Sequence, residues 1–462
     1  MWQRLQPSLN KPIAGQSLAA FRVVFGLLAV IGGARFLASG WVDQFFGKPT
    51  FFFKFLGAHW VSVAPPWAMN LCIWAIIVLG ICITLGLFYR LSTVLFFLVF
   101  SYVELTDVTN YLNHYYQVSL LALLLCILPL HRTFSLDVWR KPTLRVQHFP
   151  AWMVLLLRFQ VGVVYVFAAI AKLNADWLLH AQPLNIWLLA RTDTPLIGWM
   201  LGSFEMAMAM SWIGFLHDLL IVPALLWRRT RVLAYGVLVV FHVATGLLFN
   251  IGMFPWIMIV TATIFFPPDW PKAFWQRIRR RDGKSLDNEP DSSQQPTPMP
   301  LARWGAVLTS IWCFFHIAFP LRCMAYPGPV LWHEQGMRFA WNVMVREKTG
   351  SVTYKVKHAE RTREQLVVPN QYLTPYQEKE MATQPDLILQ LAHHIAQDYR
   401  DQGYTDVEVR VDAIASLNGR RSAPLIDPTV DLTQIEDGFA RAHWILPAPT
   451  TDPIRLKPAT KL

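Results

Sequence analysis

The chain has 462 residues, of which 54% are hydrophobic, including 20 Trp and 30 Phe, and its formal net charge at pH 7 is +11. Its apolar residues gather in runs long enough to cross a bilayer, which argues against a wholly soluble protein. The sequence therefore predicts a multi-pass α-helical membrane protein.

Nine apolar runs are candidate membrane spans. They cover residues 16–38, 65–87, 91–105, 115–130, 151–172, 203–227, 231–249, 251–267 and 303–321. Several are shorter than a perpendicular crossing requires, and 251–267 is the weakest, so we expect eight or nine spans. The first run carries Arg22 and Arg35 and lacks a small-residue cleavage site, which indicates a retained helix rather than a signal peptide.

Basic residues distribute unevenly between the two sides if the N-terminus is cytoplasmic. The outer loops then carry Lys48, Lys54 and Arg191, while the inner segments hold Arg4, Lys11, Arg90, Arg132, Arg140, Lys141, Arg145, Arg228, Arg229, Arg231, Lys272, Arg277, Arg279, Arg280, Arg281 and Lys284. The positive-inside rule favours this orientation. We interpret the basic run 277–281 as a topology determinant beside anionic lipid, and we expect no nucleic-acid partner.

The domain organisation follows from these spans. Residues 1–281 should form a transmembrane domain, 282–300 a polar, flexible cytoplasmic linker, 301–322 the last transmembrane helix, and 323–462 a non-cytoplasmic α+β domain rich in β-structure. Residues 351–358 and 406–417 alternate apolar and polar residues as strands do, and 376–400 between them has helical spacing. This orientation places the last domain in a periplasm or an organelle lumen, and the chain in a bacterial inner membrane or an endoplasmic reticulum membrane.

Lys172 stands at the end of the apolar run 151–172 and is the most unusual charged residue in the chain. A charge there is costly, so it is either a neutral base in apolar surroundings or an anchor that reaches the interface. Asn113, His114 and His242 fall at the same outer level of other spans. Each histidine alone could be an ordinary interhelical hydrogen-bonding group, but their convergence with Lys172 predicts an intramembrane site.

Other polar residues have a simpler interpretation. We expect structural ion pairs between helices from Arg22, Glu104, Arg158, Glu205, His217 and Asp218, which scatter over depth. The aromatic loop 41–55 suits an interfacial belt or a lid over an apolar ligand, and we favour the belt. The five cysteines have no metal-ligand spacing, so we expect no metal site.

Several motifs resemble those of one family in order along the chain. They are NHYY at 113–116, AKLNADW at 171–177, FH with LFNIGMF at 241–254, RFAWNVMV at 338–345, PNQYLT at 369–374 and IDPTVDLTQ at 426–434. Through them the chain resembles the vitamin K-dependent γ-glutamyl carboxylases and the wider group of membrane proteins that share their HTTM domain, most closely the bacterial type.

The resemblance implies a carboxylase of the carbon–carbon lyase class. Its co-substrates would be reduced vitamin K (menaquinol or phylloquinol), O2, CO2 and a glutamate in a protein or peptide. In the family, a neutral amine deprotonates the quinol. The anion reacts with O2 to form the epoxide and a strong base, which removes a γ-hydrogen from glutamate before CO2 is captured.

Family roles carry over to single positions in this chain. Lys172 matches the catalytic base, and His114, with Asn113 beside it, matches the histidine that handles the oxyanion. The remaining candidates are His242, Asp176 and Trp177 around the quinone, where the last two could equally be structural, and Arg338 and Trp341 in a peptide-handling surface.

The chain also departs from the vertebrate pattern. Ala171 and Asn174 replace a usual lysine and aspartate, the vertebrate outer disulfide has no counterpart, and the chain ends soon after IDPTVDLTQ. Two other functions therefore stay open: a quinol oxygenase that epoxidises without carboxylating, and a non-catalytic transporter or scaffold. The presence of Lys172 and His114 argues against the second.

Overall fold

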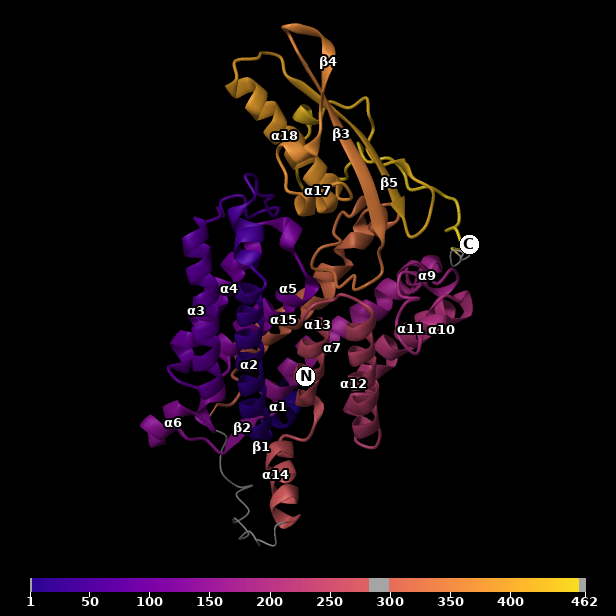
Figure 1. Cartoon of the computed structure of the whole chain (residues 1–462). Coiled ribbons are helices and arrows are strands. Elements are labelled where there is room, and N and C mark those ends of the chain that lie inside the picture. Colours follow the sequence, from indigo (N-terminus) through magenta and orange to yellow (C-terminus); the bar gives the residue numbers. More distant parts are fainter. Residues whose placement is uncertain (1, 282–298, 457–462) are drawn as a thin grey trace.

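The computed structural model describes residues 2–281 and 299–456. It consists of a helical part and a strand-containing part that sits at one end of the helices (Figure 1). The linker expected at 282–300 falls, apart from its last two residues, outside the described residues.

Six helices are long and apolar enough to cross a membrane. They are α2 (Gln16–Ala38), α3 (Pro66–Leu85), α7 (Trp152–Lys172), α11 (Phe204–Leu226), α12 (Arg231–Leu248) and α15 (Arg303–Leu321), which continues as a 3-10 turn to Ala325. The other three expected spans form shorter helices: α4 (Tyr89–Leu105), α5 (Asn113–Ile127) and α13 (Phe254–Thr261), extended by a 3-10 turn to Phe265. The mostly helical membrane-protein fold is thus confirmed, with six full-length candidate spans among the described residues. The total of eight or nine spans stays a prediction.

Short elements connect these helices. They are α1 (Trp2–Leu9), β1 (Pro12–Ala14), η1 (Asp43–Gly47), η2 (Val108–Asn110), η3 (Leu130–Arg132), α6 (Leu136–Arg140), η4 (Pro142–Leu144), β2 (His148–Pro150), α8 (Ala175–Leu178), α9 (Leu184–Leu189), α10 (Gly198–Leu201) and α14 (Trp270–Arg281). Strands β1 and β2 pair antiparallel. Figure 1 shows them with α6 and α14 at the end of the helical part opposite the main sheet.

Two arginines expected in ion pairs bind backbone carbonyls instead. Arg22 donates to the carbonyls of Thr84, Leu130 and Phe134, and Arg158 donates to those of Ile264, Phe265 and Phe266. Carbonyls at helix ends and turns lack intrahelical partners, so a buried guanidinium with several donors satisfies them. Glu205 differs again, because it is exposed and pairs with Arg455 near the end of the described chain.

Helix α7 occupies the centre of the helical part. Of the six long helices it is the most buried, and it packs closely against α11. The helix ends at Lys172 because Asn174 turns the chain: its side-chain oxygen accepts from the Trp177 backbone N–H at 3.0 Å and starts α8. This cap fixes Lys172 and Trp177 on adjacent turns.

The strand-containing part is an antiparallel sheet of order β4-β3-β5-β6, packed against helices. Its elements are η6 (Arg322–Ala325), α16 (Val330–His333), β3 (Lys348–His358), β4 (Arg361–Val367), η7 (Pro369–Gln371), α17 (Pro375–Met381), α18 (Pro385–Asp401), β5 (Glu408–Leu417), β6 (Ala423–Pro424) and η8 (Leu432–Gln434). The two expected strands are confirmed as β3 and β5, which pair along their whole length. The expected helix 376–400 is wrong as a single element, because Pro385 disfavours a helical conformation at Gln384 and splits it into α17 and α18.

The aromatic loop 41–55 joins the two parts. Phe53 and Phe55 are buried in the core of the sheet domain, and the backbone of Lys54 exchanges two hydrogen bonds with the side chain of Gln390. This loop therefore packs inside the protein, which contradicts the expected interfacial belt.

Candidate functional site

Lys172 forms a buried ion pair with Asp218 of α11. Its Nζ lies 2.8 Å from Asp218 Oδ2, 3.3 Å from the Ala168 carbonyl oxygen and 3.4 Å from that of Val343, and its side chain is only 5% exposed. Lys172 is therefore not an anchor that reaches an interface. Asp218 was expected in a structural ion pair between helices, and its partner is the candidate base itself.

Two histidines extend this cluster. His217 places Nδ1 3.0 Å from the second oxygen of Asp218, and its ring stacks on Phe241. His242 of α12 places Nε2 2.9 Å from the hydroxyl of Tyr165 on α7. The rings of His217 and His242 are 5.8 Å apart, so α7, α11 and α12 together surround the lysine with polar groups.

A small cavity of about 70 Å³ borders Lys172, and we name it the lysine chamber. Asp218, His242 and Trp177 line it, and the Trp177 ring centroid is 5.1 Å from the lysine Nζ. The indole is fixed because its N–H donates to the Ser211 carbonyl at 2.8 Å. A cation over an aromatic ring is favourable, so Trp177 stabilises the ammonium in this chamber.

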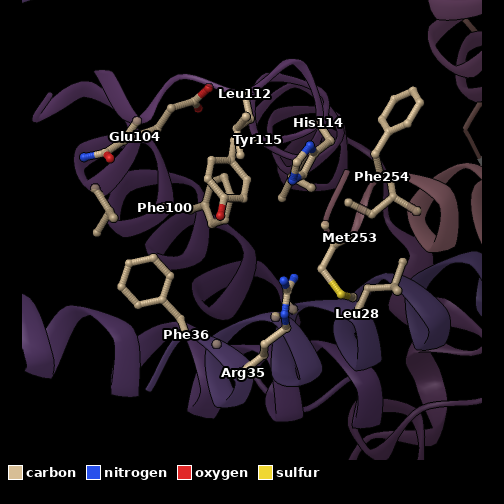
Figure 2. A pocket seen from close by; sticks show the side chains of 18 of the residues that line it. Leu28, Arg35, Phe36, Phe100, Glu104, Leu112, His114, Tyr115, Met253 and Phe254 are labelled. Atoms are coloured by element: carbon tan, nitrogen blue, oxygen red, sulfur yellow. The ribbon is translucent and has the colours of Figure 1, made fainter. Parts of the chain in front are cut away.

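His114 lies in a second, much larger cavity of about 480 Å³, the large chamber (Figure 2). Its walls are mostly apolar, and Phe36, Phe100, Leu28 and Met253 are among them. Polar side chains that line it are Arg35, Glu104, Asn110, Asn113, His114, Tyr115, Asn250, Thr261 and Tyr376. Trp41, Phe45 and Phe46 also line it, so part of the aromatic loop 41–55 borders an apolar cavity, and its alternative role as a lid over an apolar ligand stays a prediction.

The two chambers share a wall. Ile251, Phe254, Val343 and Met344 line both of them. Phe254 lies between the two histidines, with ring centroids 6.2 Å from His114 and 6.0 Å from His242. The structure therefore brings Lys172 and His242 together, and places His114 and Asn113 on the other side of this wall.

Part of the wall belongs to residues 337–346, which we name the junction loop. Phe339, Trp341 and Met344 have φ values of 62°, 58° and 53°, a left-handed conformation that costs a non-glycine residue about 1–2 kcal/mol. Two tyrosines next to the large chamber hold the loop: Tyr111 Oη accepts from the Phe339 N–H at 2.9 Å, and Tyr116 stacks on Trp341. Trp341 is completely buried, so its side chain packs inside the protein in this structure. The peptide-handling role expected of it stays a prediction.

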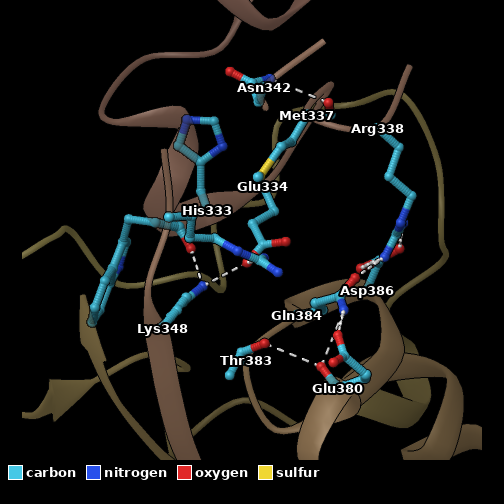
Figure 3. A network of polar contacts seen from close by, with 12 residues as sticks. His333, Glu334, Met337, Arg338, Asn342, Lys348, Glu380, Thr383, Gln384 and Asp386 are labelled. Atoms are coloured by element: carbon cyan, nitrogen blue, oxygen red, sulfur yellow. Dashed lines mark hydrogen bonds and ion pairs between the residues drawn. The ribbon is translucent and has the colours of Figure 1, made fainter. Parts of the chain in front are cut away.

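Arg338 lies at the base of a third, polar cavity of about 220 Å³, the polar chamber. Its guanidinium pairs with Asp386 and donates to Gln384, while the carboxylate of Glu334 binds Arg346 and Lys348 (Figure 3). Burial alone would lower the pKa of Arg338, but Asp386 holds it above its ordinary value. Leu112, Asn113 and Met344 line both this cavity and the large chamber, so charged groups border the apolar site directly.

Asp176 lies apart from these chambers. Both of its carboxylate oxygens are 2.6 Å from guanidinium nitrogens of Arg420, and Asn418 donates to it at 3.0 Å. It borders a separate cavity between the end of α7 and the sheet domain. Its contacts are those of a residue that ties the two parts together, which fits the structural alternative for this position.

Sequence reasoning missed Asp218 and Tyr165 as neighbours of the candidate site. A signal existed for Asp218, because a buried lysine needs a counter-charge and few acidic residues occur in the long apolar runs. Which helix supplies it depends on helix packing, which no local pattern reveals. No sequence feature marks Tyr165 as a site residue, since tyrosines are common in the packed interior of apolar helices.

Comparison with known families bears on both parts of the chain. Residues 10–270 match the model of the HTTM domain, and residues 301–451 match that of the vitamin K-dependent gamma-carboxylase lumenal domain. The chain belongs to the vitamin K-dependent γ-carboxylase family. The two matches meet at the junction where the three chambers lie. Membership implies a membrane-bound carboxylase that uses vitamin K and a glutamate-containing substrate. No solved structure matches the chain.

Proposed function

We propose that the chain γ-carboxylates glutamate residues of a protein or peptide, and that it couples this reaction to the epoxidation of reduced vitamin K by O2. The observation that carries the proposal is the buried Lys172–Asp218 pair. The cavity around it shares lining residues with a large apolar cavity that His114 lines. An anchor or a scaffold would not require this arrangement.

The large chamber suits a reduced naphthoquinone. Its volume falls in the usual range for small-molecule sites, and its apolar lining with a few polar groups matches a ligand with a flat ring, two hydroxyls and a hydrocarbon tail. The lysine chamber has room for a few water molecules only. We therefore place the quinol in the large chamber, with His114 and Asn113 near its ring.

When bound, reduced vitamin K supplies the driving force, because its oxidation generates a base strong enough to remove a γ-hydrogen from glutamate. The protein positions the reacting groups and excludes water from the site. Lys172 can begin the reaction once its Nζ passes a proton to Asp218 Oδ2, 2.8 Å away, and the free amine then accepts a proton from the quinol hydroxyl. His217, bonded to the second oxygen, keeps the carboxylate oriented for this transfer.

The shared wall sets a condition on this step. Met344 and Phe254 stand between the large chamber and Lys172, so they have to move aside when the quinol ring approaches the amine. His114 stays on the large-chamber side, where its ring can donate to negative charge on an oxygen. Its orientation is set by Tyr115, whose ring packs edge-on at 4.7 Å between centroids.

The glutamate would enter from the sheet domain. The polar chamber opens beside Asn113 and offers the guanidinium groups of Arg338 and Arg346, although each is paired with a carboxylate in this structure. A substrate carboxylate can exchange with Glu334 on Arg346, which would place the γ-carbon next to the large chamber. We further propose that this domain lies on the non-cytoplasmic side, since the basic helix α14 and the loop around α6, which carries Arg132, Lys141 and Arg145, lie at the opposite end (Figure 1).

The proposal is tested with purified protein, reduced vitamin K, a glutamate-containing peptide and labelled bicarbonate. We expect label in the peptide and epoxide in proportion to it. Epoxide without label would show a quinol oxygenase that has lost carboxylation. If a preparation that binds the quinone forms neither epoxide nor labelled peptide, the chain is a non-catalytic membrane protein.

A further inference from the structure

Arg35 is the one lysine or arginine among the described residues that line the large chamber. It lies in the last turn of α2, is half-buried, and its guanidinium points into the chamber between Phe36 and Met253 (Figure 2). His114 and Tyr115 lie across the chamber from it.

Its guanidinium lacks the partners that other arginines in the helices have. Arg22 and Arg158 each donate to three backbone carbonyls. Within the described residues the Arg35 guanidinium has no hydrogen bond and no carboxylate partner, and its Cζ lies 4.8 Å from the centroid of the Trp41 ring. Glu104, the acidic residue that lines the chamber, is bonded to Ser119.

Arg35 and His114 converge on one place. A Cβ added at Gly252 would lie 3.7 Å from Arg35 Nη1 and 3.9 Å from His114 Nε2. The absence of a side chain there keeps open the space that both groups border. Nη1 of the Arg35 guanidinium and Nε2 of His114 thus border the same small volume of the large chamber beside Gly252.

We propose that Arg35 binds an anionic oxygen on the ring of a naphthoquinone-type ligand in the large chamber. A charge in apolar surroundings is costly unless paired, and a ligand anion is the partner that the described protein does not supply. Charge-assisted hydrogen bonds from a guanidinium are strong and planar, which suits an oxygen in the plane of an aromatic ring. The proposal rests on the proposed function in one respect, the class of ligand that the chamber takes.

The test measures binding and needs no turnover. Two probes with the same short prenyl tail are compared by quenching of tryptophan fluorescence in detergent micelles: a hydroxynaphthoquinone, which is an anion at neutral pH, and the neutral methylnaphthoquinone. We expect the wild type to prefer the anion by about 10- to 100-fold. Arg35→Gln should abolish that preference while changing the affinity for the neutral probe by less than about threefold.

Two further variants support the interpretation. Arg35→Lys keeps the charge without the planar fork, so we expect part of the preference to remain. Arg90→Gln removes an arginine that binds carbonyls outside the chamber, and should leave the preference unchanged. If Arg35→Gln cannot be purified, the affinities of the wild type and of Arg35→Lys for the two probes test the proposal. A preference for the anion that is equal in both proteins would then contradict a role of the planar guanidinium.

Three results would overturn the proposal: no preference for the anion in the wild type, an unchanged preference in Arg35→Gln, or an equal loss for both probes. An anionic lipid headgroup is another source of the same charge. Adding phosphatidylglycerol to the micelles should leave the binding of both probes unchanged. If the lipid displaces the anionic probe but not the neutral one, Arg35 binds a lipid headgroup instead. A protein that shows the preference but forms no epoxide would contradict the proposed function and leave the role of Arg35 standing.

Discussion

At the scale of single residues, the Lys172–Asp218 pair dominates the site. Two opposite charges buried together offset each other, whereas removal of one partner leaves an uncompensated buried charge and typically costs about 3–5 kcal/mol. A variant at either position can therefore lose activity simply because the protein is less stable. Comparisons at this pair need a double variant in which both charges are removed.

Asp218→Asn tests whether the carboxylate moves a proton. We expect the initial rate of epoxide formation to fall by about 100-fold or more, because the amide keeps the shape and cannot accept the proton from Lys172 Nζ. Binding of the neutral quinone should be unaffected, since Asp218 does not line the large chamber. An unchanged or higher rate would show that Asp218 is only a counter-charge.

His114→Ala tests whether His114 stabilises negative charge on a ligand in the large chamber. A donor aimed at developing negative charge is typically worth about 100- to 1,000-fold in rate, so carboxylation should fall by this amount. The melting temperature should change little if His114 acts on the ligand. A large drop in melting temperature with a proportional loss of both products would instead assign His114 to helix packing.

The sequence predicted the residue types of the site better than their grouping. Lys172, His114 and His242 were expected at one level, and all three are buried near the junction. The wall that separates His114 from Lys172 and His242 includes Phe254 and Met344. Both residues lie in motifs of the family resemblance, but the motifs do not show that these side chains separate two cavities. Arg35 was used only as evidence against a signal peptide, because its lack of partners depends on the chamber around it.

At the scale of elements, the ion pair between Asp176 and Arg420 connects α8 to the end of β5. Both side chains are largely buried, and the geometry is bidentate. Arg420 also donates to the Thr451 carbonyl, so it binds three segments together. The position of the sheet domain over the chambers depends on such contacts.

Arg420→Ala should therefore uncouple the two reactions. We expect the ratio of carboxylated peptide to epoxide to fall several-fold, because the quinol site stays intact while the glutamate is no longer held beside it. Arg421→Ala is the matched control, since the neighbouring side chain is exposed. Equal ratios in the two variants would show that this ion pair has no part in coupling.

Secondary-structure prediction was correct where the alternation of apolar and polar residues matches the burial of one face of a strand. Strands β3 and β5 alternate clearly because one face of each is buried against α18. Strand β4 was missed, since it is an edge strand with mostly exposed side chains and no alternation. The short helices α4, α5 and α13 explain why span counting from hydropathy gave more spans than the structure has long helices.

At the scale of the whole molecule, the chambers lie where the helical part meets the sheet domain. Under the proposed function, a lipid-soluble quinol would enter the large chamber from the bilayer, and a protein substrate would enter the polar chamber from the aqueous side. In the proposed orientation, the basic segments at the far end of the helices lie on the cytoplasmic face.

The orientation is tested with C-terminal reporter fusions and protease protection in sealed vesicles. We expect residues 323–462 on the non-cytoplasmic side, because basic residues concentrate in the loops at the other end of the helices. A fusion after residue 281 should report the cytoplasm and serves as the control. A cytoplasmic C-terminus would remove the basis for a substrate that arrives from outside.

The central claim, that Lys172 starts both reactions, is tested most directly by measuring epoxide and incorporated label together in Lys172→Ala and in Lys172→Ala with Asp218→Asn. We expect both products to vanish in both variants, with stability restored in the double variant and partial activity recovered when a small amine is added. Lys172→Arg should stay inactive, because a guanidinium remains protonated. Epoxide at the wild-type rate in a folded Lys172→Ala protein would contradict the claim.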